Sequence, residues 1–203
     1  KDSSSLKTAF FQTIDANGVN VNLVANYPKD RQQILAVEAQ KLGIQLANDA
    51  WQWLEQQLAT PAEVRLIGSS LQVLADFPGW EGWSLYAHDQ QRLIELIRRK
   101  RASGVLFLSG DMHYAELSKL DVNVPYTLWD LTSSGLTEVW PAATPNANRV
   151  SDVIREPNFG LIEIDWQGAQ TTVTLSVMDQ RGTRRIEKRL PLAELSARPV
   201  DRP

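Results

Sequence analysis

The run Val105–Ser109 constrains the fold of this chain more than any other segment. Its first four residues are apolar, and Gly110 ends it abruptly. A short apolar run bounded by turn residues is typical of a strand buried in an α/β sheet. In open sheets of this class, the loops at the carboxyl ends of the strands usually carry the chemistry. Asp111 and His113 stand in such a loop, separated by one residue.

Helical and strand patterns alternate on both sides of this run. Residues 50–58 place apolar side chains on one helical face, and residues 89–101 do the same with Leu93, Ile94 and Ile97. Residues 64–67 and 126–132 are expected to be strands, each followed by a turn of small residues. The order helix, strand, helix, strand, strand predicts a mixed α/β sheet.

The carboxyl-terminal part of the chain has the clearest strand pattern. Residues 159–166, 171–179 and 183–190 read as strands joined by glycine-containing turns, so we expect a β meander over 159–190. Residues 141–157 are expected to form a long surface loop. Residues 1–40 are poorly defined, although the turn signal at 17–18 predicts a hairpin between 10–14 and 19–24. Residues 41–203 are then one domain.

The composition excludes several classes of protein. The chain has 203 residues, no cysteine and a net charge of -3, so it lacks disulfides, cysteine nucleophiles and the basic excess typical of nucleic-acid-binding proteins. Its basic cluster at 98–101 closes a predicted helix, where cations pair with the negative helix end; phosphate binding is the alternative. No apolar run approaches the roughly 20 residues of a membrane span. Residues 1–5 do not resemble a signal peptide.

Asp111 and His113 are candidate metal ligands. Gly110 lets the backbone turn sharply, and alternate residues then point the same way. Carboxylate and imidazole groups suit iron, manganese, zinc or calcium. The pattern by itself leaves two alternatives open. In the first, Asp111 is the cap of a helix that begins at Tyr114 and binds no metal. In the second, His113 is a hydrogen-bonded structural residue.

The surrounding segments add a resemblance. They are residues 50–58, 66–74, 79–83, 106–116, 131–137 and 159–166. The most specific are Ser-Gly-Asp-x-His at 109–113 and Thr-Ser-Ser-Gly-Leu-Thr at 132–137. In this order, over about residues 42–166, the chain resembles the carboxyl-terminal half of the PhoD-like phosphatases (alkaline phosphatase D family). The fold class implied is α/β: a mixed β-sheet sandwich with flanking helices, the carboxyl-terminal half of a four-layer αββα metallo-dependent phosphatase fold.

The resemblance implies a metal-dependent phosphomonoesterase or phosphodiesterase acting on a phosphoester substrate. In the wider metallophosphatase superfamily the equivalent loop usually reads Gly-His-x-His and its histidines bind metal, so Asp111 and His113 inherit the catalytic and metal-ligand positions. The implied cofactors are two metal ions (iron, manganese, zinc or calcium), which clamp the phosphate and lower the pKa of a bound water. The resemblance favours a periplasmic or secreted location, and the sequence leaves a cytoplasmic one open.

The family's first ligands lie in an amino-terminal half on loops that bear Asp and His. This chain has only two histidines, His88 and His113, and its first 40 residues offer no such loops. A two-metal site needs more ligands than one loop supplies. We therefore expect a fragment that is inactive alone, with the amino-terminal half of the same protein as its partner.

Five further residues are expected to contact substrate or to support the ligands: Gln72, Glu81, Glu116, Ser133 and Ser134. Gln72 hydrogen-bonds substrate or a ligand, and Glu81 either reaches the pocket or anchors its own loop. Glu116 either orients the His113 imidazole or is exposed at the surface. Turn chemistry explains the two serines equally well, and no histidine pairs with them as in a serine hydrolase. His88 is expected to be a helix cap or a surface residue.

Two alternative functions stay open at the level of sequence. The same scaffold is a non-catalytic α/β binding or structural module if the missing ligand loops are absent from the whole protein. Alternatively, residues from 159 onward form an independent β domain that binds sugars or surfaces. The chain's seven tryptophans, more than its size requires, would then line an exposed groove.

Overall fold

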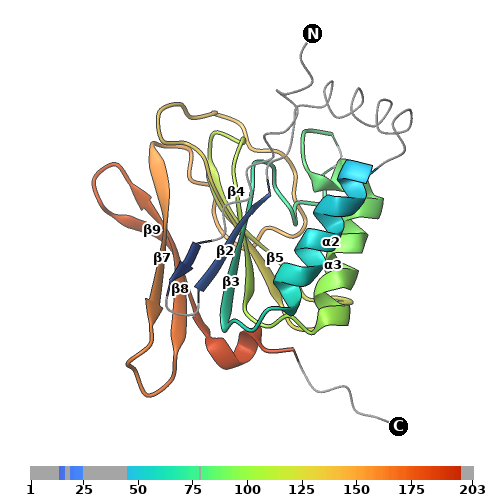
Figure 1. The fold of residues 1–203 in the computed structure, drawn as a ribbon. Helices are drawn as coiled ribbons and strands as arrows, with labels where there is room; N and C mark the ends of the chain where they lie inside the picture. The colour runs from blue at the N-terminus through green and yellow to red at the C-terminus, as the bar shows by residue number, and fades with distance from the viewer. Residues whose placement is uncertain (1–13, 17–18, 25–44, 78, 198–203) are drawn as a thin grey trace.

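A six-stranded sheet forms the middle layer of the molecule (Figure 1). The computed structural model describes residues 14–16, 19–24, 45–77 and 79–197. The sheet has the order β1-β2-β3-β4-β6-β5. Its strands are β1 (Ile14–Ala16), β2 (Val19–Val24), β3 (Val64–Ser69), β4 (Val105–Ser109), β5 (Ala115–Leu120) and β6 (Leu128–Ser133). Strands β2, β3, β4 and β6 run parallel, and the edge strands β1 and β5 run antiparallel to their neighbours.

Two helices cover one face of this sheet, α2 (Gln45–Ala59) and α3 (Ala87–Lys100), with the 3₁₀ turn η2 (Trp83–Tyr86) leading into α3. Their buried residues are Leu54, Leu58, Leu93, Leu96 and Ile97. Every residue of β3 is buried, as expected for a parallel strand covered on both faces. The helices and the strands before and after them are therefore confirmed, with Leu96 more deeply buried than Ile94.

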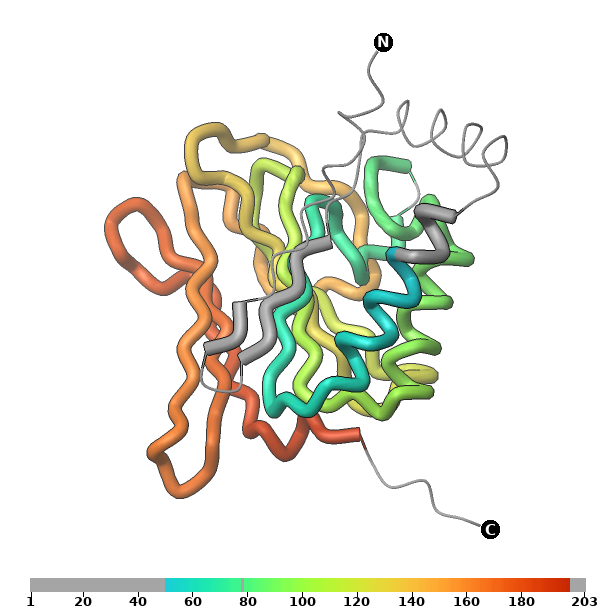
Figure 2. The backbone as a smooth tube through the Cα atoms, viewed as in Figure 1, coloured from blue at the N-terminus to red at the C-terminus, as the bar shows by residue number. Residues whose placement is uncertain are grey.

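A three-stranded antiparallel meander covers the other face (Figure 2). It consists of β7 (Asn158–Asp165), β8 (Thr172–Asp179) and β9 (Arg184–Pro191), followed by the 3₁₀ turn η3 (Leu192–Leu195). Val173, Leu175 and Val177 of β8 belong to the same hydrophobic core as Phe107 of β4. The predicted meander is confirmed, and its shared core argues against an independent β domain from residue 159 onward.

The helices, the six-stranded sheet and the meander make three layers. The expected α/β class, a mixed β-sheet sandwich with flanking helices, is thus confirmed. Within the described residues α2 and α3 are the α-helices, so a second helical layer of a four-layer αββα fold is not among them. Neither helix is long and apolar enough to cross a membrane.

The segment after His113 is a strand, so the alternative in which Asp111 caps a helix beginning at Tyr114 is wrong. In β5, Ala115 and Glu116 pair with Ser133 and Thr132 of β6 in antiparallel register. At the amino end, β1 and β2 pair antiparallel as the hairpin signal predicts. Residues 10–13, the turn at 17–18 and most of the poorly defined segment 1–40 lie outside the described residues.

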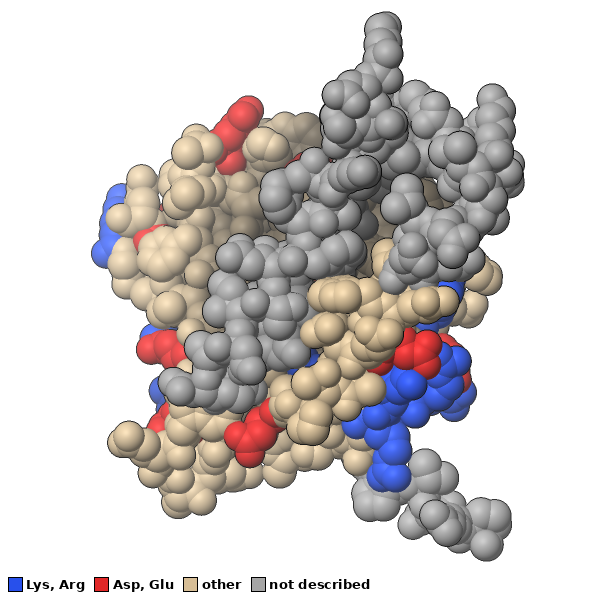
Figure 3. Space-filling view, in the orientation of Figure 1, with Lys and Arg blue, Asp and Glu red and all other residues tan. Residues whose placement is uncertain are grey.

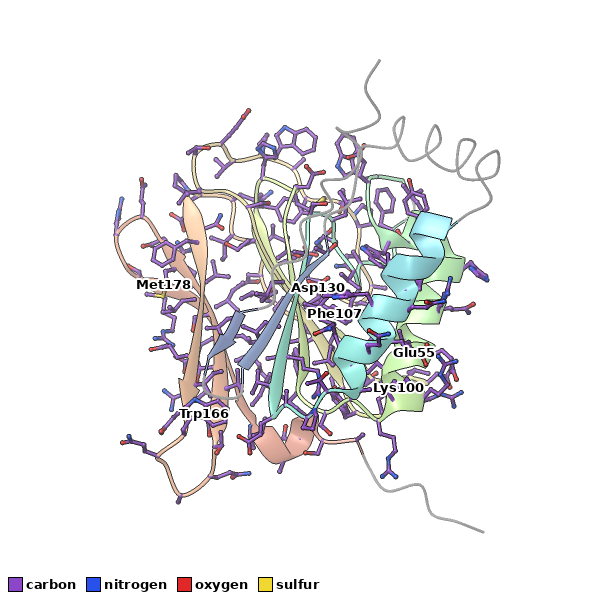
Figure 4. The ribbon with its side chains drawn as sticks, viewed as in Figure 1. Glu55, Lys100, Phe107, Asp130, Trp166 and Met178 are labelled. Atoms are coloured by element: carbon purple, nitrogen blue, oxygen red, sulfur yellow. The ribbon has the colours of Figure 1, made fainter. Side chains whose placement is uncertain are left out.

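The basic cluster at 98–101 closes α3 as expected. Arg98, Arg99 and Lys100 occupy the last helical turn, and Arg101 follows in a left-handed conformation. Glu55 of α2 forms ion pairs with Arg99 at 3.1 Å and with Lys100 at 2.7 Å. Figure 3 shows these charges gathered over the ends of the two helices, and Figure 4 shows Glu55 close to Lys100. The cluster thus serves the packing of α3 against α2.

Candidate functional site

The carboxyl ends of β3, β4 and β6 meet at one edge of the six-stranded sheet. Gly68 pairs with Leu108, and Ser109 pairs with Thr132, so the three parallel strands end at nearly the same level. Antiparallel β5 begins at this edge. The loops 70–82, 110–114 and 134–157 therefore emerge side by side, at the edge where α/β sheets usually bind their ligands.

The loop 110–114 presents Asp111 and His113 away from the core. Met112 and Tyr114 are buried, whereas Asp111 is exposed and the His113 side chain is 40% exposed. Asp111 and His113 both adopt left-handed backbone conformations, with φ of 70° and 55°. Such conformations are costly outside glycine and persist only where surrounding contacts hold them.

Two backbone contacts hold this loop to the segment after β6. The His113 N–H donates to Ser134 Oγ at 2.9 Å, and the His113 carbonyl accepts from the Trp140 N–H at 2.9 Å. Ser133 Oγ instead donates to Asn158 Oδ1 at 2.9 Å, which ties β6 to β7. Both serines therefore make turn and inter-strand contacts, the structural role that the sequence left open for them.

The His113 imidazole carries an unpaired nitrogen. Its Nδ1 atom is buried and has no hydrogen-bond partner among the described residues. Glu138 Oε2 lies 4.0 Å from this atom, too far for a hydrogen bond. Buried polar atoms are nearly always paired, so this nitrogen can accept a partner from outside the described residues.

Glu116 lies beneath the loop rather than beside His113. Its side chain is fully buried and accepts hydrogen bonds from Gln72 Nε2 at 2.8 Å, Asn146 Nδ2 at 2.6 Å and Arg149 Nε at 2.5 Å. The expectation that Glu116 orients the imidazole and the alternative that it is exposed are both wrong. The reason is that β5 turns its second residue into the protein, where an arginine and two amides pair it.

Gln72 extends this network toward the neighbouring strands. Its amide nitrogen also donates to Thr132 Oγ1 at 3.0 Å, and the Thr132 and Ser109 hydroxyls are 2.8 Å apart. Ser109 Oγ donates to Asp130 Oδ1 at 2.7 Å. The Gln72 amide nitrogen thus donates to the side chains of Glu116 and Thr132.

Asp130 ends this network, and sequence reasoning missed its role. Its Oδ2 accepts the Val73 and Leu74 N–H groups at 2.7 and 3.0 Å. Burial raises the pKa of Asp130 above its ordinary range, against the lowering effect of these hydrogen bonds. Figure 4 places Asp130 next to Phe107 in the middle of the molecule. The available signal was an aspartate between the apolar residues Trp129 and Leu131.

Two residues remain to be placed, Glu81 and His88. Glu81 is half-buried. Burial of the Tyr86 hydroxyl raises the pKa of Tyr86, and the nearby Glu81 charge raises it further. Its loop is held by Trp83, whose N–H donates to the Gln72 carbonyl at 3.0 Å. The His88 side chain is 91% exposed on α3, so the surface role expected for it is confirmed.

Asp111 and His113 fit part of a metal site. An exposed carboxylate and an unpaired imidazole nitrogen are suitable donors for iron, manganese or zinc. Protein metal sites usually take three or four protein ligands. No group of three or more His, Cys, Asp or Glu side chains able to hold a metal occurs among the described residues. Asp111 and His113 alone are therefore too few to form such a site.

Comparison with known proteins places the fold. No family model matches the chain, and no curated protein matches it. A solved structure of GAP50, described as the anchor in the inner membrane complex of Plasmodium, matches with a TM-score of 0.58 at 14% identity. The match covers 90% of this chain and 53% of the GAP50 chain. The chain therefore shares its fold with the matched part of GAP50, a metallophosphatase-fold protein.

A solved structure of PhoD also matches, with a TM-score of 0.48 at 11% identity over 89% of this chain and 43% of the PhoD chain. The chain thus spans about half the length of the solved structures it matches. At these identities the likeness concerns the fold, and activity has to be argued from the residues.

Proposed function

We propose that this chain contributes the Asp111–His113 loop to the active site of a metal-dependent phosphoester hydrolase. The observation that carries the proposal is the unpaired, buried Nδ1 of His113 beside an exposed aspartate, at the carboxyl edge of the sheet. The fold that the chain shares with GAP50, a metallophosphatase-fold protein, supports the same reading.

The other ligands would come from outside the described residues. The match to about half of the GAP50 chain supports a partner segment, the amino-terminal half expected from the sequence. In that assembly the Asp111 carboxylate and the His113 imidazole would hold metal, which neutralises phosphate charge and acidifies water when bound. This chain's own contribution is positioning. Ser134 fixes the His113 backbone, and the buried Met112 keeps the two side chains turned outward.

The test compares ligand variants with matched controls in the full-length gene product. His113→Ala and Asp111→Asn are measured for bound metal and for hydrolysis of bis(4-nitrophenyl) phosphate and 4-nitrophenyl phosphate. We expect both quantities to fall by at least about tenfold, since each change removes a metal ligand. His88→Ala and Asp121→Asn alter the other histidine and an exposed aspartate, and they should change neither quantity. An unchanged metal content and an unchanged hydrolysis rate in both ligand variants would contradict the proposal.

A second candidate is a non-catalytic scaffold on the same fold. It is favoured by the lack of a three-ligand group among the described residues and by the match to GAP50, which is described as an anchor. This candidate predicts that the full-length gene product binds no stoichiometric metal and hydrolyses neither ester. Metal-dependent turnover that is lost in His113→Ala contradicts it.

A further inference from the structure

Two exposed tryptophans lie beside the candidate ligand loop. Trp80 is 39% exposed and Trp140 is 38% exposed. Their rings meet edge to face, with centroids 5.0 Å apart and planes at 61°. The Trp140 ring is 6.0 Å from the His113 imidazole, at 37°. The three rings thus form a row that begins at a candidate metal ligand.

The other tryptophans of the described chain serve the core. Trp83 and Trp129 are buried, and Trp51, Trp53 and Trp166 are half-buried and pack against the core. Exposed tryptophans are unusual because the indole ring is a large apolar surface. That the two exposed ones touch each other at the edge holding Asp111 and His113 indicates a recognition surface.

Both rings lie on loops that are fixed by hydrogen bonds. The Trp140 backbone N–H donates to the His113 carbonyl at 2.9 Å, which fixes the backbone of this loop relative to His113. The Trp80 loop is fixed by Trp83, whose Nε1 donates to Ser69 Oγ at 3.1 Å. Asp76 of the same loop accepts the Ala147 N–H at 2.7 Å, which joins it to the loop after Trp140. A pre-ordered aromatic surface binds with little loss of conformational entropy.

We propose that Trp80 and Trp140 bind the ring of an aryl phosphoester, a planar aromatic group on the alcohol side of the substrate. The phosphate part of this assignment rests on the proposed function, whereas the ring part rests on the two tryptophans alone. A ring joined directly to phosphate keeps both groups within the short span between Trp140 and His113. Aromatic rings attract one another beyond the burial of apolar area, so an aryl group gains more here than an aliphatic ring of similar size.

The experiment follows the tryptophan indole N–H signals of the full-length gene product by nuclear magnetic resonance, so that the metal ligands proposed to lie outside the described residues are present. Phenyl phosphate, phenol, cyclohexyl phosphate and inorganic phosphate are titrated with and without Zn²⁺. We expect phenyl phosphate to shift the Trp80 and Trp140 signals saturably. Cyclohexyl phosphate and inorganic phosphate should leave these two signals nearly unmoved.

Substitutions assign the signals and test the affinity. Trp140→Leu and Trp80→Leu should each weaken phenyl phosphate binding roughly three- to tenfold. Trp166→Leu is the matched control, because Trp166 follows the far end of β7 (Figure 4), and it should bind phenyl phosphate as well as the unchanged chain does. Circular dichroism verifies that each variant folds, and two independent tryptophan variants keep the test decisive.

Each outcome separates the ring assignment from the proposed function. Equal binding of phenyl and cyclohexyl phosphate, or immobile Trp80 and Trp140 signals, overturns the ring assignment whatever the activity assays give. Equal binding of phenol and phenyl phosphate with Zn²⁺ present overturns the phosphoester part. If phenyl phosphate shifts the two tryptophan signals but His113→Ala keeps its bound metal and its hydrolysis rate, the proposed function is overturned. The ring assignment then still holds.

Discussion

At the scale of single residues, Asp130 is the acceptor that holds the 72–76 segment against the sheet. Its carboxylate takes two backbone N–H groups and a hydroxyl, all buried. Asp130→Ala leaves these donors unpaired and should lower the free energy of unfolding by about 3 kcal/mol or more. Asp130→Asn keeps one carbonyl oxygen for the two N–H groups, so about 1 kcal/mol is expected. Denaturant unfolding measures the free energy of unfolding of both variants. Equal decreases in the two variants would contradict the role of Asp130 as a hydrogen-bond acceptor.

The buried Asp130 also makes stability depend on pH. Burial raises its pKa in the folded state above the ordinary value of 3.8. The folded protein therefore holds this proton more tightly than the unfolded chain, and the resulting stability is complete below pH 3.8 and lost as pH rises through the folded-state pKa.

Asp130→Asn cannot titrate and removes this dependence. The free energy of unfolding of the unchanged protein, relative to Asp130→Asn, should thus fall as pH rises. Denaturant unfolding of both proteins between about pH 4 and about pH 8 measures the difference. A difference that stays constant or grows with pH contradicts the assignment.

At the scale of elements, the sequence predicted the strands whose burial is apolar and missed the one whose burial is polar. Val105–Ser109 and the meander carry apolar runs or alternation between turn signals. Strand β5 buries Glu116 and Ser118. Because both side chains are polar, no hydrophobic pattern in the sequence indicates that they are buried. Their partners, Gln72, Asn146 and Arg149, are far along the chain, so no local reading of the sequence assembles them.

The same elements yield a test of the buried ion pair. Arg149 is 19% exposed and is the cation paired with the fully buried Glu116. Arg149→Met leaves the Glu116 carboxylate buried without a cation and should cost about 3–5 kcal/mol. Adding Glu116→Gln removes the stranded charge, so the double variant should be more stable than Arg149→Met alone. A double-mutant cycle by denaturant unfolding measures the coupling, and additive losses would contradict the pairing.

At the scale of the whole molecule, the parallel order of β3, β4 and β6 brings three distant loops to one edge. The sequence identified Asp111 and His113 because they follow a recognisable strand. It did not identify Trp140 as their neighbour, because that contact depends on the path of the long loop after β6. The local sequence pattern thus predicts which residues follow a strand. The residues that contact them in space depend on the topology of the sheet and its loops.

The shared core makes a final prediction about cooperativity. Leu175 of β8 is fully buried and belongs to one core with Phe107 of β4. Leu175→Ala should therefore destabilise the whole molecule by about 2–5 kcal/mol, with one transition seen alike by circular dichroism and tryptophan fluorescence. Thr174→Ala alters the adjacent, half-buried position and should cost about 1 kcal/mol or less. If the meander were an independent unit, Leu175→Ala would split unfolding into two transitions and leave the transition of the six-stranded sheet and its helices unchanged.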